Sequence, residues 1–144
     1  MNYHFLVHKE DDGFWAESVE LEGCHTQANT LEELKKACEE SLDLFLEEPS
    51  ESNVAFPLPN ESLESNNDLL SVKVDPEIAL AVLLRHYRKD NNLTQKQVSE
   101  MLGMKNVYSY QRLERKSNPT LKIMSNIHTV FPDMKMDYIF SKRE

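Results

Sequence analysis

The sequence predicts two parts of different fold class, an α+β part over residues 1–74 and an all-α part over residues 75–144. In the first part, apolar and polar side chains alternate in short runs, as in strands, whereas in the second apolar residues recur at steps of three and four, as in helices. The charge divides the chain in the same way. Residues 1–70 carry three Lys and Arg against seventeen Asp and Glu, a net charge of −14, and residues 71–144 carry thirteen against eight, a net charge of +5.

The first strands are predicted from alternation and from turns. Residues 3–9 alternate, residues 10–13 form a turn ending in a glycine that can adopt positive φ, and residues 14–19 alternate again. Residues 3–19 therefore predict a hairpin. Residues 24–28, after Gly23, are a candidate third strand.

A helix follows the three strands. Thr30 and Glu33 have the spacing of a capping box, and the helix should end before Pro49. Its apolar stripe is predicted to consist of Leu31, Leu34, Cys38, Leu42 and Phe45.

Residues 50–70 are rich in Ser, Asn and Glu, and predict a long loop or partly ordered linker. Val72 and Val74 suggest a last strand that returns to the sheet. The order β-β-β-α-β predicts a three- to four-stranded antiparallel sheet with one helix on one face. The opposite face would be left exposed, which suggests an interface.

Four helices are predicted in the second part. Asp75 and Pro76 suit the N-cap and first position of a helix that ends within 88–92, and Thr94 opens a second capping box. Gly103 ends this second helix. A third helix, capped by Asn106, runs from residue 107 to about 115, and a fourth spans 121–131. The apolar tail at 134–139 fits either a strand or a helix.

Two short helices joined by a turn that contains glycine form a helix-turn-helix pattern, in which the second helix enters the DNA major groove. Residues 77–131 resemble the phage-repressor (XRE) family of DNA-binding domains. The matching residues are Thr94-Gln95, Val98, Met101-Leu102-Gly103, Leu113-Glu114-Arg115 and Asn118-Pro119-Thr120-Leu121. The resemblance implies that the chain binds operator DNA, as a homodimer or a higher homo-oligomer.

The register of the third helix has two alternatives, because one residue more than usual for the family separates Gly103 from Glu114. Counting from Gly103 would shift the base-facing set by one residue. We prefer counting from Glu114, because Leu113 must then reach the core and Asn106 caps the helix. This register makes four positions face the bases: Val107, Tyr108, Gln111 and Arg112.

The chemistry of these side chains suggests their roles. Arg112 is a candidate to read guanine through two hydrogen bonds, and Gln111 or Asn106 is a candidate to read adenine. Tyr108 suits a thymine methyl group or a phosphate, whereas Tyr110 is expected to pack in the core. Val107 is apolar, so it contributes no hydrogen bond to a base.

A second set of residues suits the DNA backbone. Lys105, Arg115 and Lys116 flank the third helix and are predicted to contact phosphates, which position a protein without specifying sequence. Gln95, at the start of the second helix, suits a phosphate or a bracing contact to the third helix. In the XRE family an Arg and a Glu at the positions of Arg88 and Glu114 pair, so the resemblance implies a structural salt bridge there.

The first part resembles the HicB antitoxin family over residues 3–48, through the hairpin turn Asp12-Gly13-Phe14, Leu21-Glu22-Gly23-Cys24, and the helix opening Thr30-Leu31-Glu32-Glu33. Residues 56–59 and 72–74 fit its closing strand. The resemblance implies a partial ribonuclease-H-like fold that binds a small basic ribonuclease toxin of the HicA type, while the other part represses the operon. Independently, the charge of −14 suits a basic partner.

Two other functions remain open. The first is a stand-alone regulator whose first part senses a ligand or mediates oligomerisation, and the second is a metal-dependent nuclease that uses carboxylates such as Asp11 and Asp12. Cys24, His25 and Cys38 lack the spacing of a zinc site, and buried free cysteines are expected. We expect no enzyme activity, cofactor or metal. The sequence suggests neither a signal peptide nor a membrane span, and predicts a soluble, cytoplasmic protein.

Overall fold

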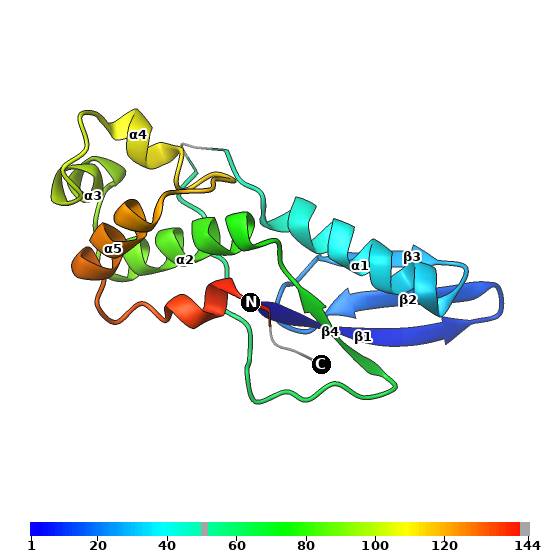
Figure 1. Ribbon diagram of the computed structural model, residues 1–144. Helices are drawn as coiled ribbons and strands as arrows, with labels where there is room; N and C mark the ends of the chain where they lie inside the picture. The colour runs from blue at the N-terminus through cyan, green and yellow to red at the C-terminus, as the bar shows by residue number, and fades with distance from the viewer. Residues whose placement is uncertain (50–51, 142–144) are drawn as a thin grey trace.

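The computed structural model describes residues 1–49 and 52–141, with the sheet and its helix at one end and a group of short helices at the other (Figure 1). The elements in chain order are β1 (Asn2–Glu10), β2 (Gly13–Ser18), β3 (His25–Ala28), α1 (Leu31–Leu46), β4 (Leu69–Lys73), α2 (Pro76–Asp90), α3 (Gln95–Met101), α4 (Val107–Gln111), α5 (Leu121–Val130) and the 3₁₀ helix η1 (Met136–Ile139). The predicted fold class is confirmed. We call β1–β4 with α1 the sheet part, and α2–η1 the helical part.

The sheet has the strand order β3-β2-β1-β4, and all neighbouring strands are antiparallel. The predicted hairpin and third strand are therefore both present. Gly13 begins β2 where the chain passes close to β3: a Cβ atom added there would lie 2.6 Å from the Ala28 carbonyl oxygen. Only glycine fits this close approach without moving the backbone.

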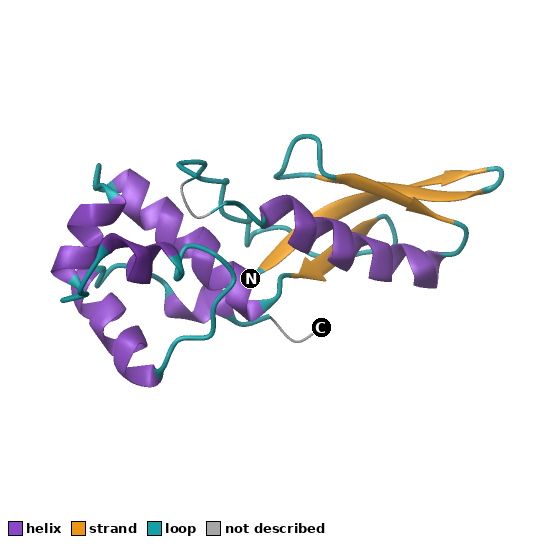
Figure 2. Ribbon diagram, turned by 90° about the horizontal axis from the view of Figure 1, so that it is seen from above, coloured by secondary structure: helices purple, strands orange, loops and turns teal. Residues whose placement is uncertain are grey.

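Helix α1 packs against β2, β3 and β4 and covers one face of the sheet, as Figure 2 shows from above. The hydroxyl of Thr30 accepts a hydrogen bond from the Glu33 amide at 3.2 Å, as its N-cap role predicts. The predicted apolar stripe needs one correction. Leu31, the first residue of α1, is 39% exposed, whereas Leu46 in the last turn is buried.

The last strand begins earlier than predicted, because β4 starts at Leu69, inside the expected loop of residues 50–70. Pairing with β1 draws residues 69 and 70 into the sheet. The described part of the loop lies against the sheet part: Tyr3 donates a hydrogen bond from its hydroxyl to the Pro57 carbonyl at 2.7 Å, and the rings of Phe45 and Phe56 lie 5.5 Å apart.

The helical part begins where its caps predicted. The Asp75 side chain accepts a hydrogen bond from the Glu77 amide at 2.9 Å. At the start of α3, Thr94 and Gln97 form both arms of the capping box, at 3.1 and 2.8 Å. Of the two alternatives for the tail, the structure shows a short helix, η1, which packs on α2.

The two parts share one hydrophobic core. Buried apolar side chains from β1, α1, α2, α5 and η1 belong to a single cluster. The two ends of the described chain also meet, because the Met1 amine donates a hydrogen bond to the Phe140 carbonyl at 2.6 Å. No helix within residues 1–49 and 52–141 is long and apolar enough to cross a membrane.

Candidate nucleic-acid interface

The two helices of the helix-turn-helix pattern, α3 and α4, pack on each other. Gly103 follows the end of α3 with a φ of 69°, a left-handed conformation that favours glycine. After the turn, Asn106 caps α4 by accepting a hydrogen bond from the Ser109 amide at 3.0 Å. Local chemistry therefore ends one helix and begins the next, and it leaves α4 at the edge of the molecule (Figure 1).

Helix α4 is shorter than predicted. It ends at Gln111 and not near residue 115, and Arg112 is its C-cap. Beyond it the chain tightens into turns, with a hydrogen bond of 2.8 Å from the Leu113 amide to the Tyr110 carbonyl. The backbone bonding changes there, because the Arg115 amide also bonds three residues back, to the Arg112 carbonyl at 3.4 Å. Tyr110, Leu113 and Glu114 are all buried, at the spacing of one helix face.

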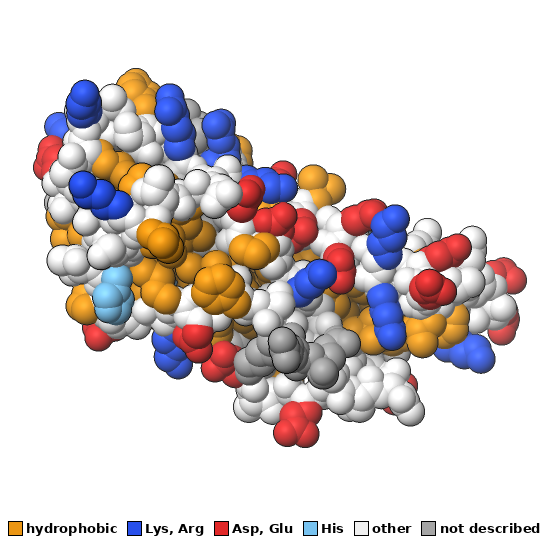
Figure 3. Space-filling model, viewed as in Figure 1, with side chains coloured by type: hydrophobic (Ala, Val, Ile, Leu, Met, Phe, Trp, Pro, Cys, Tyr) orange, Lys and Arg blue, Asp and Glu red, His pale blue; other side chains and the backbone are white. Residues whose placement is uncertain are grey.

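The outer side of this region carries most of the residues predicted to contact DNA. Tyr108 is 69% exposed, which separates it from Tyr110, buried in the core. Two further predicted residues, Val107 and Gln111, are half-buried. The exposed members of the set are Lys105, Asn106, Tyr108, Arg112, Arg115 and Lys116. In Figure 3, Lys and Arg side chains gather over the end of the molecule formed by α3 and α4.

Behind this surface, Arg88 and Glu114 form the ion pair that the sequence predicted. The guanidinium donates two hydrogen bonds to the carboxylate, at 2.6 and 2.9 Å, and the two side chains are 2% and 0% exposed. Burial opposes the charge on Arg88, but hydrogen bonding and attraction to Glu114 outweigh it, so the pKa of Arg88 is raised. This ion pair joins α2 to the segment after α4.

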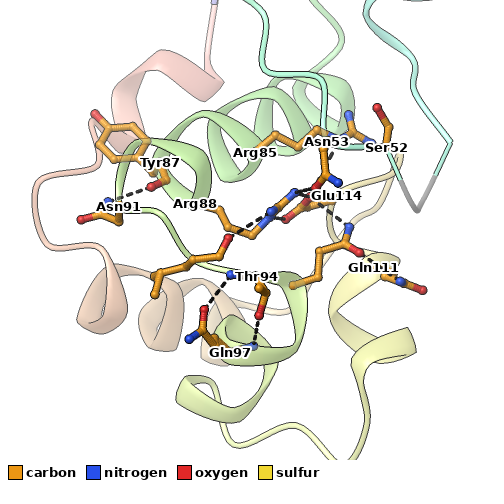
Figure 4. Close-up of polar contacts among 12 residues, drawn as sticks. Ser52, Asn53, Arg85, Tyr87, Arg88, Asn91, Thr94, Gln97, Gln111 and Glu114 are labelled. Carbon is orange, nitrogen blue, oxygen red and sulfur yellow. Dashed lines mark hydrogen bonds and ion pairs between the residues drawn. The ribbon is translucent and has the colours of Figure 1, made fainter.

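Gln95 braces the recognition helix α4. Its side-chain oxygen accepts a hydrogen bond from the Gln111 amide at 3.0 Å, and its own amide donates to Glu114 at 3.3 Å. Figure 4 labels these two partners, Gln111 and Glu114. Of its two predicted roles, the bracing role is therefore observed, and the phosphate contact stays a prediction. The same bond orients the Gln111 side chain and uses one of the two N–H donors of its amide.

Two residues of this polar cluster were missed by the sequence analysis. Arg85 is buried and donates hydrogen bonds to the carbonyls of Glu48 and Pro49 at 3.3 and 3.4 Å, and its Nε lies 3.9 Å from Glu114. Burial lowers the pKa of Arg85, which attraction to Glu114 only partly offsets. Arg85 lies one turn before Arg88 on an apolar helix, and this position could have predicted that both arginines are buried on the same side. Asn53 accepts a hydrogen bond from Arg88 at 3.3 Å, and nothing in its linker sequence predicts that contact.

Lys116 has a neighbour within the protein that the sequence analysis did not predict. Its ammonium group lies 3.7 Å from the Asp75 carboxylate at the start of α2, and both side chains are partly exposed. An ion pair of this kind contributes little to stability. It does place Lys116 beside α2, so any phosphate contact competes with Asp75.

Cys24 and Cys38 are both buried and free, and burial raises the pKa of their thiols to about 11 and about 12. Within the part of the chain that the structure describes, no group of three or more His, Cys, Asp or Glu side chains lies close enough to hold a metal ion.

An exposed recognition helix behind a glycine turn, with a basic outer surface, defines the class of helix-turn-helix DNA-binding proteins. Residues 84–139 match the family model described as Helix-turn-helix, and this supports a DNA-binding regulator. The chain is also similar to the UPF0150 protein of Archaeoglobus fulgidus, with 40% identity over 48 residues, which are 33% of this chain and 70% of that protein. The chain belongs to the UPF0150 protein family.

Proposed function

We propose that the chain is an antitoxin of the HicA/HicB type, which binds an mRNA-cleaving toxin through its sheet part and represses its own operon through its helical part. The observation that carries the proposal is the separation of charge between the two ends. The DNA-facing end around α4 is basic, whereas residues 1–70, which include most of the sheet part, carry a net charge of −14. The first suits a polyanion and the second a basic protein.

Operator binding requires more than one copy of the chain. Helix α4 has only five residues, so one copy reads only a few base pairs. Two copies related by a two-fold axis would place their α4 helices in successive major grooves, about 34 Å apart. The proposed role is that of a binding protein and not of an enzyme.

The DNA-binding role is tested by titrating the chain with its own promoter DNA at several salt concentrations. Phosphate contacts release counterions, so six or more of them predict a loss of affinity of about 1,000-fold or more between 50 and 200 mM salt. Fluorescence anisotropy of labelled DNA measures this slope. Affinity that is independent of salt would exclude a phosphate-contacting role for the basic end.

The antitoxin role is tested in cells that produce the HicA-type toxin of the same genome. Co-expression of the whole chain is expected to restore growth, because the sheet part covers the toxin. The whole chain is required, since the two parts share one core and neither is shown to fold alone. Operator binding without rescue of growth would leave a stand-alone regulator as the function.

A further inference from the structure

The sheet has one face that α1 does not cover. The strand register places three residues of β1 on that face, His4, Leu6 and His8. On β4, Ser71 lies opposite His4 and Leu69 lies opposite Leu6. On the other side, Trp15 of β2 lies opposite His8, and Gln27 of β3 lies opposite Trp15. We call this the open face. Successive side chains of a strand point to opposite sides of a sheet, so these residues share one surface.

One end of the open face forms an ordered apolar surface. The rings of His8 and Trp15 stack with their centroids 4.0 Å apart and an interplanar angle of 16°. Glu17 holds the His8 ring from the side, with 3.1 Å between its carboxylate and Nε2. Leu6, between Glu17 and Leu69 in the register, is 36% exposed. A stacked aromatic pair and a leucine that face solvent form an apolar patch typical of a binding surface.

The other end of the open face is covered by the chain itself. His4 is buried, its Nδ1 lies 2.8 Å from the Glu20 carboxylate, and the Asn60 amide donates to the same carboxylate at 3.0 Å. The loop before β4 and the C-terminal tail stand over this end and leave a hollow of about 720 Å³. The same face is therefore sealed at His4 and uncovered at Trp15.

Carboxylates surround both ends of this surface. Glu10 and Glu17 are exposed on β1 and β2 beside the aromatic pair. Glu61, Glu64 and Asp137 line the hollow, together with the rings of Tyr138 and Phe140. This surface is complementary to cationic side chains, which can stack on Trp15 and pair with the carboxylates.

We propose that the open face, from the Trp15–His8 pair to the hollow beside His4, is the docking surface for the small basic toxin. This inference rests on the proposed antitoxin function and specifies where on the sheet part the toxin binds. The partner presents Lys and Arg side chains around an apolar centre. The outer side of α1 stays free of the toxin.

The experiment compares two charge reversals in the whole chain, Glu17→Lys on the open face and Glu40→Lys on the outer side of α1. Both replace an exposed glutamate and change the net charge equally. Isothermal titration with a catalytically inactive variant of the HicA-type toxin measures affinity. We expect Glu17→Lys to weaken binding by about tenfold or more, since like charges then meet, and Glu40→Lys to change it by less than about threefold.

A second variant, Gln27→Lys, adds a positive charge to the same face without breaking the His8–Glu17 contact, and should also weaken toxin binding. Thermal unfolding and operator binding show that each variant is folded. If the unaltered chain binds no toxin, the proposed function itself fails. If the unaltered chain binds and both open-face variants bind equally well, or Glu40→Lys is the weaker binder, the toxin docks elsewhere. Loss of self-association by the open-face variants, with toxin binding retained, would assign this face to a second copy.

Discussion

Replacing Glu114 by alanine is expected to destabilise the protein by about 3–5 kcal/mol, the usual effect of removing one partner of a buried ion pair. Glu114 is fully buried and accepts two hydrogen bonds from Arg88, and Arg85 lies 3.9 Å from it. Without the carboxylate, two buried guanidinium groups face each other with no negative charge between them. Urea unfolding followed by circular dichroism measures the loss of free energy of unfolding.

The matched control for this prediction is Glu100→Ala, since Glu100 is an exposed glutamate on α3. That variant should change stability by less than about 0.5 kcal/mol. Glu114→Gln keeps the shape of the side chain but removes its charge. If the charge stabilises the fold, the free energy of unfolding of this variant should be close to that of Glu114→Ala. Equal stability of Glu114→Ala and Glu100→Ala would show that the cluster of Arg85, Arg88 and Glu114 contributes nothing to the fold.

Replacing Arg112 by alanine is expected to weaken operator binding by about 1–3 kcal/mol and to relax the sequence preference at one position of each half-site. Arg112 is exposed at the C-cap of α4, where a guanidinium can reach base edges, and it is not one of the buried residues of the core. Anisotropy titrations against the operator and against single-base variants of it measure both effects.

Arg115→Ala is the comparison for Arg112→Ala, because Arg115 is also exposed but lies beyond the recognition helix. We expect it to weaken binding to all DNA sequences by a similar factor and to lower the salt dependence. If Arg112→Ala behaved in this uniform way, Arg112 would be a phosphate contact, and the base-reading register would have to move along α4.

The predictions that succeeded rest on short-range chemistry. Thr30, Asp75, Thr94 and Asn106 each cap the helix that follows, and each cap needs only its own side chain and an amide two or three residues on. The hairpin followed from alternation and from the glycine at its turn. The Arg88–Glu114 pair followed from a resemblance, since no local rule joins residues 26 positions apart.

The predictions that needed correction depend on burial. Tyr110, Leu113 and Glu114 are buried at the spacing of one helix face, so the sequence favoured a helix that continues to about residue 115. The change to hydrogen bonds three residues back after Gln111 is visible only in the packed chain. Three other features depend likewise on which neighbour covers each segment. They are the exposure of Leu31, the residue at which β4 begins, and the helical conformation of the tail.

The amino-acid sequence by itself determined the order of strands and helices, the helix caps, the division of charge and the place of the helix-turn-helix pattern. Each of these depends on residues that are neighbours along the chain. Only the tertiary structure decided that Gln95 is held between Gln111 and Glu114, that Asn53 reaches Arg88, and that the open face is sealed at His4 but not at Trp15. Such contacts join residues far apart in sequence, and they form only when packing of the shared core brings the segments together.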